Sequence, residues 1–298
     1  MSANPKLTAT FKLLFKLLLT AAALFIAFRK IEIGKTIQIV QEASVVYLLI
    51  GLLLYIISKI LSSIRLKYFF DAEKIQIDHI SNLKLYCIGM FYNLFLPGGI
   101  GGDGYKAFYM KRNFNGSMKK ILLAIFLDRV SGMLALTFFC CLFFLLTLAD
   151  ISLFANIIAG ITLILIFPVS YGITLLFLKL HAIYFIRTSL YSIVVQGIQS
   201  LAALVIFVSI NLQDSYLVYI NLFLVSSIFA AIPFTIGGIG ARELAFVLAA
   251  EFIGIDIDMA IAFSILFFLI NVISSLPGIF IRLSPNKQIK PQGLQLSQ

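Results

Sequence analysis

The chain has 298 residues, of which 61% are hydrophobic and only 12% are charged, and its mean hydropathy is +1.05. Soluble domains are about 45–50% apolar and about 25% charged, so this composition excludes a soluble enzyme and indicates an all-α integral membrane protein. The formal net charge of +10 does not indicate a nucleic-acid partner, because the excess Lys and Arg of membrane proteins gathers in cytoplasmic loops. We expect one polytopic membrane domain over residues 1–284 and a cytoplasmic polar tail at 285–298.

Six apolar runs are candidates for full transmembrane helices, each of which needs roughly 20 residues. They are Leu13–Phe28, Ala43–Leu61, Ile121–Leu148, Leu153–Leu178, Leu190–Leu212 and Met259–Ile281. The first run is interpreted as an uncleaved span rather than a signal peptide, because Arg29 and Lys30 follow it in place of a small-residue cleavage site.

Two further apolar segments, Leu83–Leu96 and Tyr216–Ile236, lead into breaks rich in glycine and proline. Such residues interrupt helices, and irregular backbone survives in lipid only where protein buries it or where it lines a wet cavity. If the first segment entered the membrane and returned, the five basic residues after its break would stay on the cytoplasmic side with both termini. These residues are Lys106, Lys111, Arg112, Lys119 and Lys120.

The second segment behaves as a mirror image of the first, since a return over Tyr216–Ala250 leaves only acidic residues outside. This topology leaves Arg129 and Arg242 as the basic residues within the membrane. Three full spans separate the two breaks, so the halves 1–150 and 151–284 would have opposite orientations. The sequence therefore predicts about six full transmembrane helices plus two opposed re-entrant helical hairpins in an inverted repeat, a plan that places the transporter site at the breaks. Chance recurrence of a glycine-rich motif is the alternative.

The residues after each break suit an anion. Asp103 and Lys106 share a helix face, and a helix start offers free N–H groups and a positive dipole end. Arg242, which follows the second break, can grip phosphate in a bidentate manner. The structural alternatives are that Asp103 caps its helix while Lys106 reaches the interface, and that Arg242 pairs locally with Glu243.

Further polar residues lie close to these motifs in the sequence. Asp128 is expected to face Lys106 or Arg242, and Arg129 to face Asp103, because adjacent positions on a helix point in different directions. Gln196 and Gln199 could face the same cavity. The candidate substrate-binding residues are Asn93, Pro97, Gly98, Gly99, Gly101, Gly102, Asp103, Lys106, Asp128, Arg129, Pro233, Thr235, Gly237, Gly238, Gly240, Arg242 and Glu243.

The segments Phe91–Asp103 and Pro233–Glu243, together with the Asp128-Arg129 pair, resemble the transmembrane region of lysylphosphatidylglycerol synthases. The resemblance covers nearly the whole chain. In the bifunctional members of that family, a soluble aminoacyltransferase domain makes an aminoacyl lipid and the membrane part moves it between leaflets. The resemblance therefore implies a stand-alone, flippase-like protein of the cell membrane that lacks the soluble domain.

The sequence thus favours a non-catalytic protein that binds an anionic or phosphate-bearing phospholipid, or a lipid-linked substrate, between its two glycine motifs. It shows no nucleotide-binding motif, metal spacing or cofactor motif. Two alternatives stay open. One is a membrane-embedded transferase that uses Asp103 or Asp128 as a base, and the other is a scaffold for a separate lipid-modifying enzyme.

Overall fold

The computed structural model describes residues 32–95, 101–114, 116–148, 150–213, 215–231 and 240–283, and these are mostly helical and contain no strand. The expected first span and the polar tail lie outside the described residues. The helices are α2 (Ile33–Glu42), α3 (Val45–Ala72), α4 (His79–Phe95), α5 (Gly101–Asn113), α6 (Met118–Thr147), α7 (Leu153–Phe177), α8 (Lys179–Ala182), α9 (Phe185–Ser209), α10 (Tyr216–Ala231), α11 (Ala241–Ile253), α12 (Ile257–Ser275) and α13 (Pro277–Phe280).

Among the described residues, five helical segments are long and apolar enough to cross a membrane: α3, α6, α7, α9, and α12 together with α13. Each overlaps one of the predicted spans. The predicted second span ends at Leu61, whereas α3 continues as one helix to Ala72. The charged residues that follow Leu61 are accommodated within the helix. Lys67 and Asp71 form an i,i+4 ion pair at 2.8 Å, and Arg65 is buried against a partner described below.

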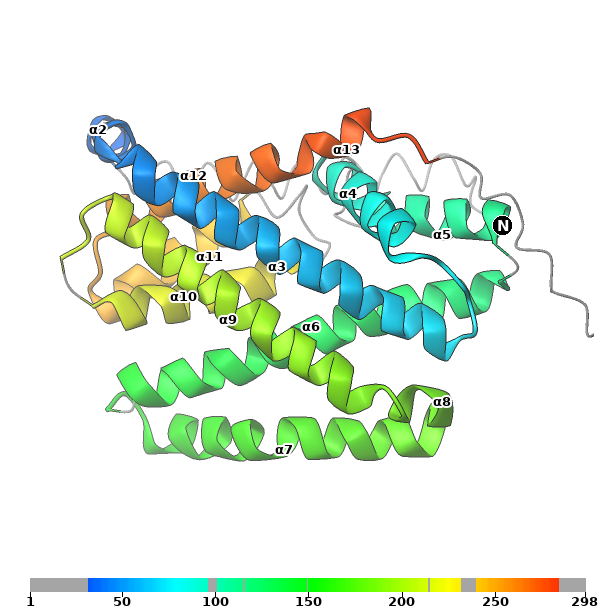
Figure 1. The fold of residues 1–298 in the computed structure, drawn as a ribbon. Coiled ribbons are helices and arrows are strands. Elements are labelled where there is room, and N and C mark those ends of the chain that lie inside the picture. Colours follow the sequence, from blue (N-terminus) through cyan, green and yellow to red (C-terminus); the bar gives the residue numbers. More distant parts are fainter. Residues whose placement is uncertain are drawn as a thin grey trace, which may run out of the picture.

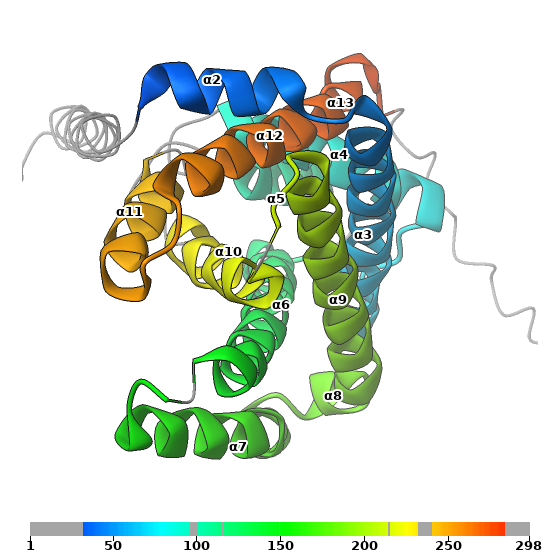
Figure 2. The ribbon, with the colours of Figure 1, turned by 90° about the vertical axis from the view of Figure 1, so that its left-hand side faces the viewer.

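Helices α3 and α9 run side by side through the protein (Figures 1 and 2). Beside them, aromatic side chains of α9, α10, α11 and α12 form the larger core, in which the rings of Phe207 and Phe263 stack at 3.9 Å. A second core joins α3, α4, α5 and α6 through buried side chains such as Leu66, Leu85 and Met110. Helix α7 lies at the margin, packed on α6, and exposes most of its surface (Figure 1).

Four helices of intermediate length form two pairs at the positions of the two predicted hairpins. Helix α4 packs against α5, and α10 packs against α11. Figure 1 shows the first pair toward one end of the long helices and the second pair toward the other end. Residues 96–100 and 232–239, which connect the members of each pair, lie outside the described residues.

Helix α2 is attached to the start of α12 by polar contacts. Lys35 Nζ lies 2.8 Å from Asp256 Oδ2, and the hydroxyl of Thr36 donates to Asp258 Oδ1 at 3.0 Å. Partial burial raises the pKa of Asp256, but the hydrogen bonds from Lys35 and from backbone N–H groups outweigh it and hold the pKa below its usual range. The contact is therefore stabilised when Asp256 is ionised.

Candidate functional site

Glycines let α4 and α5 approach closely at the first motif. A Cβ atom on Gly102 would lie 1.8 Å from the carbonyl oxygen of Gly89, so only glycine fits at this crossing. The side-chain oxygen of Asn93 accepts a hydrogen bond from the backbone N–H of Gly102 at 2.8 Å. Asn93 thus satisfies one of the free N–H groups at the start of α5.

Each of the two carboxylate oxygens of Asp103 forms an ion pair with a different basic side chain. Lys106 Nζ lies 3.2 Å from Oδ1, and Arg129 Nε bonds to Oδ2. The predicted pairing of Arg129 with Asp103 is therefore confirmed. Lys106 is buried, and its ammonium also lies 4.5 Å from the ring centre of Tyr86, so it faces the protein interior rather than the interface.

Asp128 does not face Lys106 or Arg242, so that prediction is wrong. Its Oδ1 lies 2.7 Å from Nε of Arg65, and both side chains are less than a tenth exposed. Arg65 comes from α3, and its guanidinium fits beside Gly132, where a Cβ would lie 3.3 Å from Nη1. The pair forms because α3 continues past Leu61 and carries Arg65 to the level of Asp128 on α6.

The guanidinium of Arg65 extends a polar chain toward α9. Its Nη1 donates to the hydroxyl of Ser192 at 2.9 Å, and the hydroxyls of Ser131 and Ser192 lie 2.7 Å apart. Ser192 in turn donates to the carbonyl of Thr188 at 2.9 Å. This arrangement satisfies the buried hydroxyls and fixes the position of Arg65.

The second motif presents Arg242 and Glu243 in different roles. Gly240 has a φ of 84°, which favours glycine, and its N–H donates to Glu243 Oε2 at 2.7 Å. The other carboxylate oxygen of Glu243 accepts from Ser264 at 2.6 Å. Among the described contacts, Glu243 therefore caps α11 and makes no close ion pair with Arg242.

Arg242 rests on aromatic rings. Its guanidinium carbon lies 4.6 Å from the ring centre of Phe267 and 5.6 Å from that of Phe223. Its Nε is buried and has no hydrogen-bond partner within the part of the chain that the structure describes. Cation–π contacts hold the charge but leave a donor unsatisfied.

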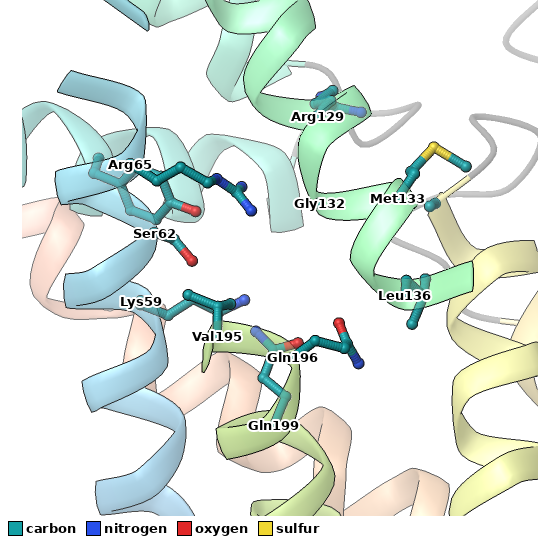
Figure 3. Close-up of a pocket in the computed structure, with 12 residues that line it drawn as sticks. Lys59, Ser62, Arg65, Arg129, Gly132, Met133, Leu136, Val195, Gln196 and Gln199 are labelled. Carbon is teal, nitrogen blue, oxygen red and sulfur yellow. The ribbon is translucent and has the colours of Figure 1, made fainter. Parts of the chain in front are cut away.

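Two neighbouring cavities of about 200 and 230 Å³ lie between these elements and share Lys59 and Tyr86 as lining residues. We refer to them together as the basic cavity. Figure 3 shows Lys59 and Arg65 of α3, Arg129 of α6, and Gln196 and Gln199 of α9 around its first part. The second part is lined by Tyr55, Lys59, Tyr86, Met90, Asn93, Leu94, Lys106, Ala230 and Asn271.

Lys59 is the feature that the sequence did not predict. It lies near the middle of α3, and its Nζ is 4.4 Å from the ring centre of Tyr55. It forms no ion pair with a carboxylate among the described residues, whereas Arg65, Lys106 and Arg242 all act on it as like charges. A cation within the predicted span Ala43–Leu61 was the available signal, because such residues are costly in lipid.

The structure thus brings together Asn93, Lys106 and Arg129 as lining residues, with Asp103 and Asp128 bonded behind them. Gln196 and Gln199 also line the cavity, in agreement with the expectation that they face it. No group of three metal-ligating side chains occurs among the described residues. The predicted site residues that lie outside the described residues are Pro97, Gly98, Gly99, Pro233, Thr235, Gly237 and Gly238.

Comparison with known proteins matches residues 13–278 to the family described as the lysylphosphatidylglycerol synthase TM region. Because the match covers most of the chain, the protein belongs to this family and is a multi-pass membrane protein. The chain is also similar to the UPF0104 membrane protein PH1989 of Pyrococcus horikoshii, with 28% identity over 136 residues. That alignment covers 45% of this chain and 41% of the relative.

Proposed function

We propose that the protein is a non-catalytic, flippase-like lipid transporter of the cell membrane. It binds an anionic or phosphate-bearing head group in the basic cavity and moves or presents that lipid across the bilayer. Membership of this family supports a lipid as the transported molecule. The basic side chains of the cavity support a lipid whose head group is negatively charged.

The observation that carries this proposal is the excess of positive charge in the basic cavity. Four basic side chains line it, Lys59, Arg65, Lys106 and Arg129, while the carboxylates bonded to them are those of Asp103 and Asp128. Charges buried in a membrane protein normally face a partner or a cavity. A phosphate offers several acceptor oxygens and the missing negative charge, so it complements both the ammonium of Lys59 and the nearby guanidinium groups.

The paired short helices support the re-entrant part of the proposal. With 13 to 17 residues each, α4, α5, α10 and α11 are about 20–26 Å long, which is shorter than a hydrocarbon core of about 30 Å. The two pairs also lie toward opposite ends of the long helices (Figure 1). Two hairpins that enter from opposite faces would meet at the basic cavity, with both chain termini on the cytoplasmic side.

The carboxylates of the cavity argue against a transferase that uses them as a base. Asp103 is bonded to Lys106 and Arg129, and Asp128 is bonded to Arg65. Both carboxylates are therefore already occupied by basic side chains of the protein itself. These two side chains are better suited to holding cations in place than to removing a proton from a substrate.

Reconstitution into liposomes tests the proposal. Fluorescent phosphatidylglycerol should exchange between leaflets in the presence of the protein, without formation of a new lipid species. Replacing Lys59 by Met should slow exchange about tenfold or more, because a charge-assisted hydrogen bond contributes about 1.5–3 kcal/mol. Lys67→Met is the matched control on the same helix, since Lys67 pairs with Asp71 and does not line the cavity.

Two results would overturn the proposal. Exchange by the Lys59→Met variant at the wild-type rate would show that the cavity charge is not used. Conversion of the labelled lipid into a new species would show that the protein is an enzyme.

A further inference from the structure

A third cavity lies on the other side of α6 from the basic cavity. Its volume is about 430 Å³, within the range of about 300–1,000 Å³ that is typical of small-molecule sites. It is lined largely by apolar side chains of α6, α7 and α9, including Leu127, Val130, Leu134, Ile173 and Phe185. We call it the apolar pocket.

One polar side chain of the apolar pocket is left without a partner. His181 is 4% exposed, and its Nε2 lies 2.8 Å from Oε1 of Glu73. Its Nδ1 is buried and has no hydrogen-bond partner within the described part of the chain. By contrast, the hydroxyls of Ser170, Thr174 and Thr188 in the same lining donate to backbone carbonyls of their own helices.

The contact with Glu73 determines what His181 can bind. Lys120 Nζ lies 3.7 Å from the second oxygen of Glu73. An ionised carboxylate only accepts hydrogen bonds, so Nε2 of His181 must donate to it. In the neutral ring, Nδ1 is then an acceptor, and it has no donor among the described residues although His181 lines the pocket.

The position of the pocket indicates how a ligand arrives. Phe126 and Ile173 line it and are 61% and 52% exposed, so the pocket reaches the apolar outer surface of the helices. Helix α7, which forms one wall, also lies at the margin of the protein (Figure 2). In a membrane this surface faces acyl chains, so the occupant enters from the bilayer rather than from water.

We propose that the apolar pocket binds the acyl chain of a membrane lipid that carries a free hydroxyl group, such as a monoacylglycerol. The chain fills the apolar lining, and the hydroxyl donates a hydrogen bond to Nδ1 of His181. This site is separate from the basic cavity, because Leu127, Val130 and Leu134 line the pocket while Arg129 and Gly132 of the same helix line the cavity. It does not depend on the proposed function.

Thermal unfolding of the purified full chain in detergent tests this site with two probes that share one acyl chain. 1-Oleoylglycerol carries free hydroxyls, and methyl oleate carries none. 1-Oleoylglycerol should raise the unfolding temperature saturably and at lower concentration than methyl oleate. His181→Phe keeps a ring but removes the acceptor, and should weaken the apparent affinity for 1-oleoylglycerol about tenfold, to that for methyl oleate.

A second pair of variants tests the pocket itself. Val130→Phe adds volume inside the pocket and should abolish the shifts with both probes. Ile164→Phe makes a similar change on a part of α7 that is 71% exposed and outside the pocket, and should leave the shifts unchanged. If His181→Phe fails to fold, the Val130→Phe result decides.

The proposal is overturned if the two probes stabilise the wild-type protein equally. It is also overturned if His181→Phe keeps the preference for 1-oleoylglycerol, or if Val130→Phe retains the shift.

Discussion

Replacing Asp128 by asparagine leaves the guanidinium of Arg65 buried without its counter-charge. The two side chains are 7% and 9% exposed, and the bond between them is 2.7 Å long. Breaking a buried ion pair by removing one partner costs about 3–5 kcal/mol, because the other charge stays desolvated. The bond from Arg65 to Ser192 remains, and asparagine keeps an acceptor, so we expect the lower end, about 3 kcal/mol.

The temperature at which half of the purified protein loses its monodisperse form measures this loss. At about 2–4 °C per kcal/mol, Asp128→Asn should lower it by about 6–12 °C. Asp71→Asn is the matched control, because it removes the more exposed i,i+4 pair with Lys67 on α3. A pair of that kind contributes at most about 0.5 kcal/mol, so the control should shift by about 2 °C or less.

A double variant separates a lost ion pair from a general effect of mutation. Arg65→Met combined with Asp128→Leu removes both charges, so it should be more stable than Asp128→Asn alone. The reasoning would be refuted if Asp128→Asn shifted no more than the control. It would also be refuted if the double variant fell to the sum of its two single variants.

Single cysteines at Asn115 and Ile255, in a background without the native cysteines, should be labelled from the cytoplasmic and the external side respectively. If the cysteine at Asn115 is labelled from outside, the first hairpin, α4 and α5, crosses the membrane fully. Arg242→Lys should lose part of the lipid exchange while still accumulating in the membrane, because lysine lacks the planar guanidinium that rests on Phe267 and Phe223, and normal exchange by Arg242→Ala would show that the second motif is not needed for exchange. Because the pKa of Asp256 is lowered, its contact with Lys35 stabilises the protein at pH values above the ordinary pKa of a carboxyl group. This contribution to stability is lost as the pH falls below about 3.9. Pepsin cleavage near α2 should therefore rise on acidification in the wild type and show a smaller rise in Asp256→Asn, whereas equal rises would exclude Asp256 as the cause.

The sequence predicted the long helices because lipid imposes a length and an apolar composition on them. It placed the end of the second span at Leu61, whereas α3 continues through the following charged residues to Ala72. Those charges are tolerated within one helix because Arg65 meets Asp128 and Lys67 meets Asp71. The cost of a charge depends on its partner, and the apolar pattern alone does not show where that partner lies.

In the candidate site, too, the sequence predicted a contact between residues close in the chain and missed one between distant residues. The spacing of Asp103 and Lys106 predicted a shared helix face, and the two side chains do form a bond. The pair of Arg65 and Asp128 joins residues 63 positions apart, and it depends on how α3 and α6 rotate against each other. A single sequence does not determine that rotation, so the partner of Asp128 was predicted incorrectly.

The charge of Lys59 has opposite consequences for stability and for binding. Lys59 has no carboxylate partner among the described residues, and such a cation is costly at membrane depth, by about 2.5–3.5 kcal/mol on insertion scales; Arg65, Lys106 and Arg242 add repulsion. Lys59→Met should therefore raise the unfolding temperature of the protein in a neutral detergent, while it weakens stabilisation by added phosphatidylglycerol. The pair of measurements is decisive because a purely structural lysine would behave in the opposite way. If Lys59→Met destabilises the lipid-free protein and phosphatidylglycerol stabilises variant and wild type equally, Lys59 supports the fold and does not hold an anion.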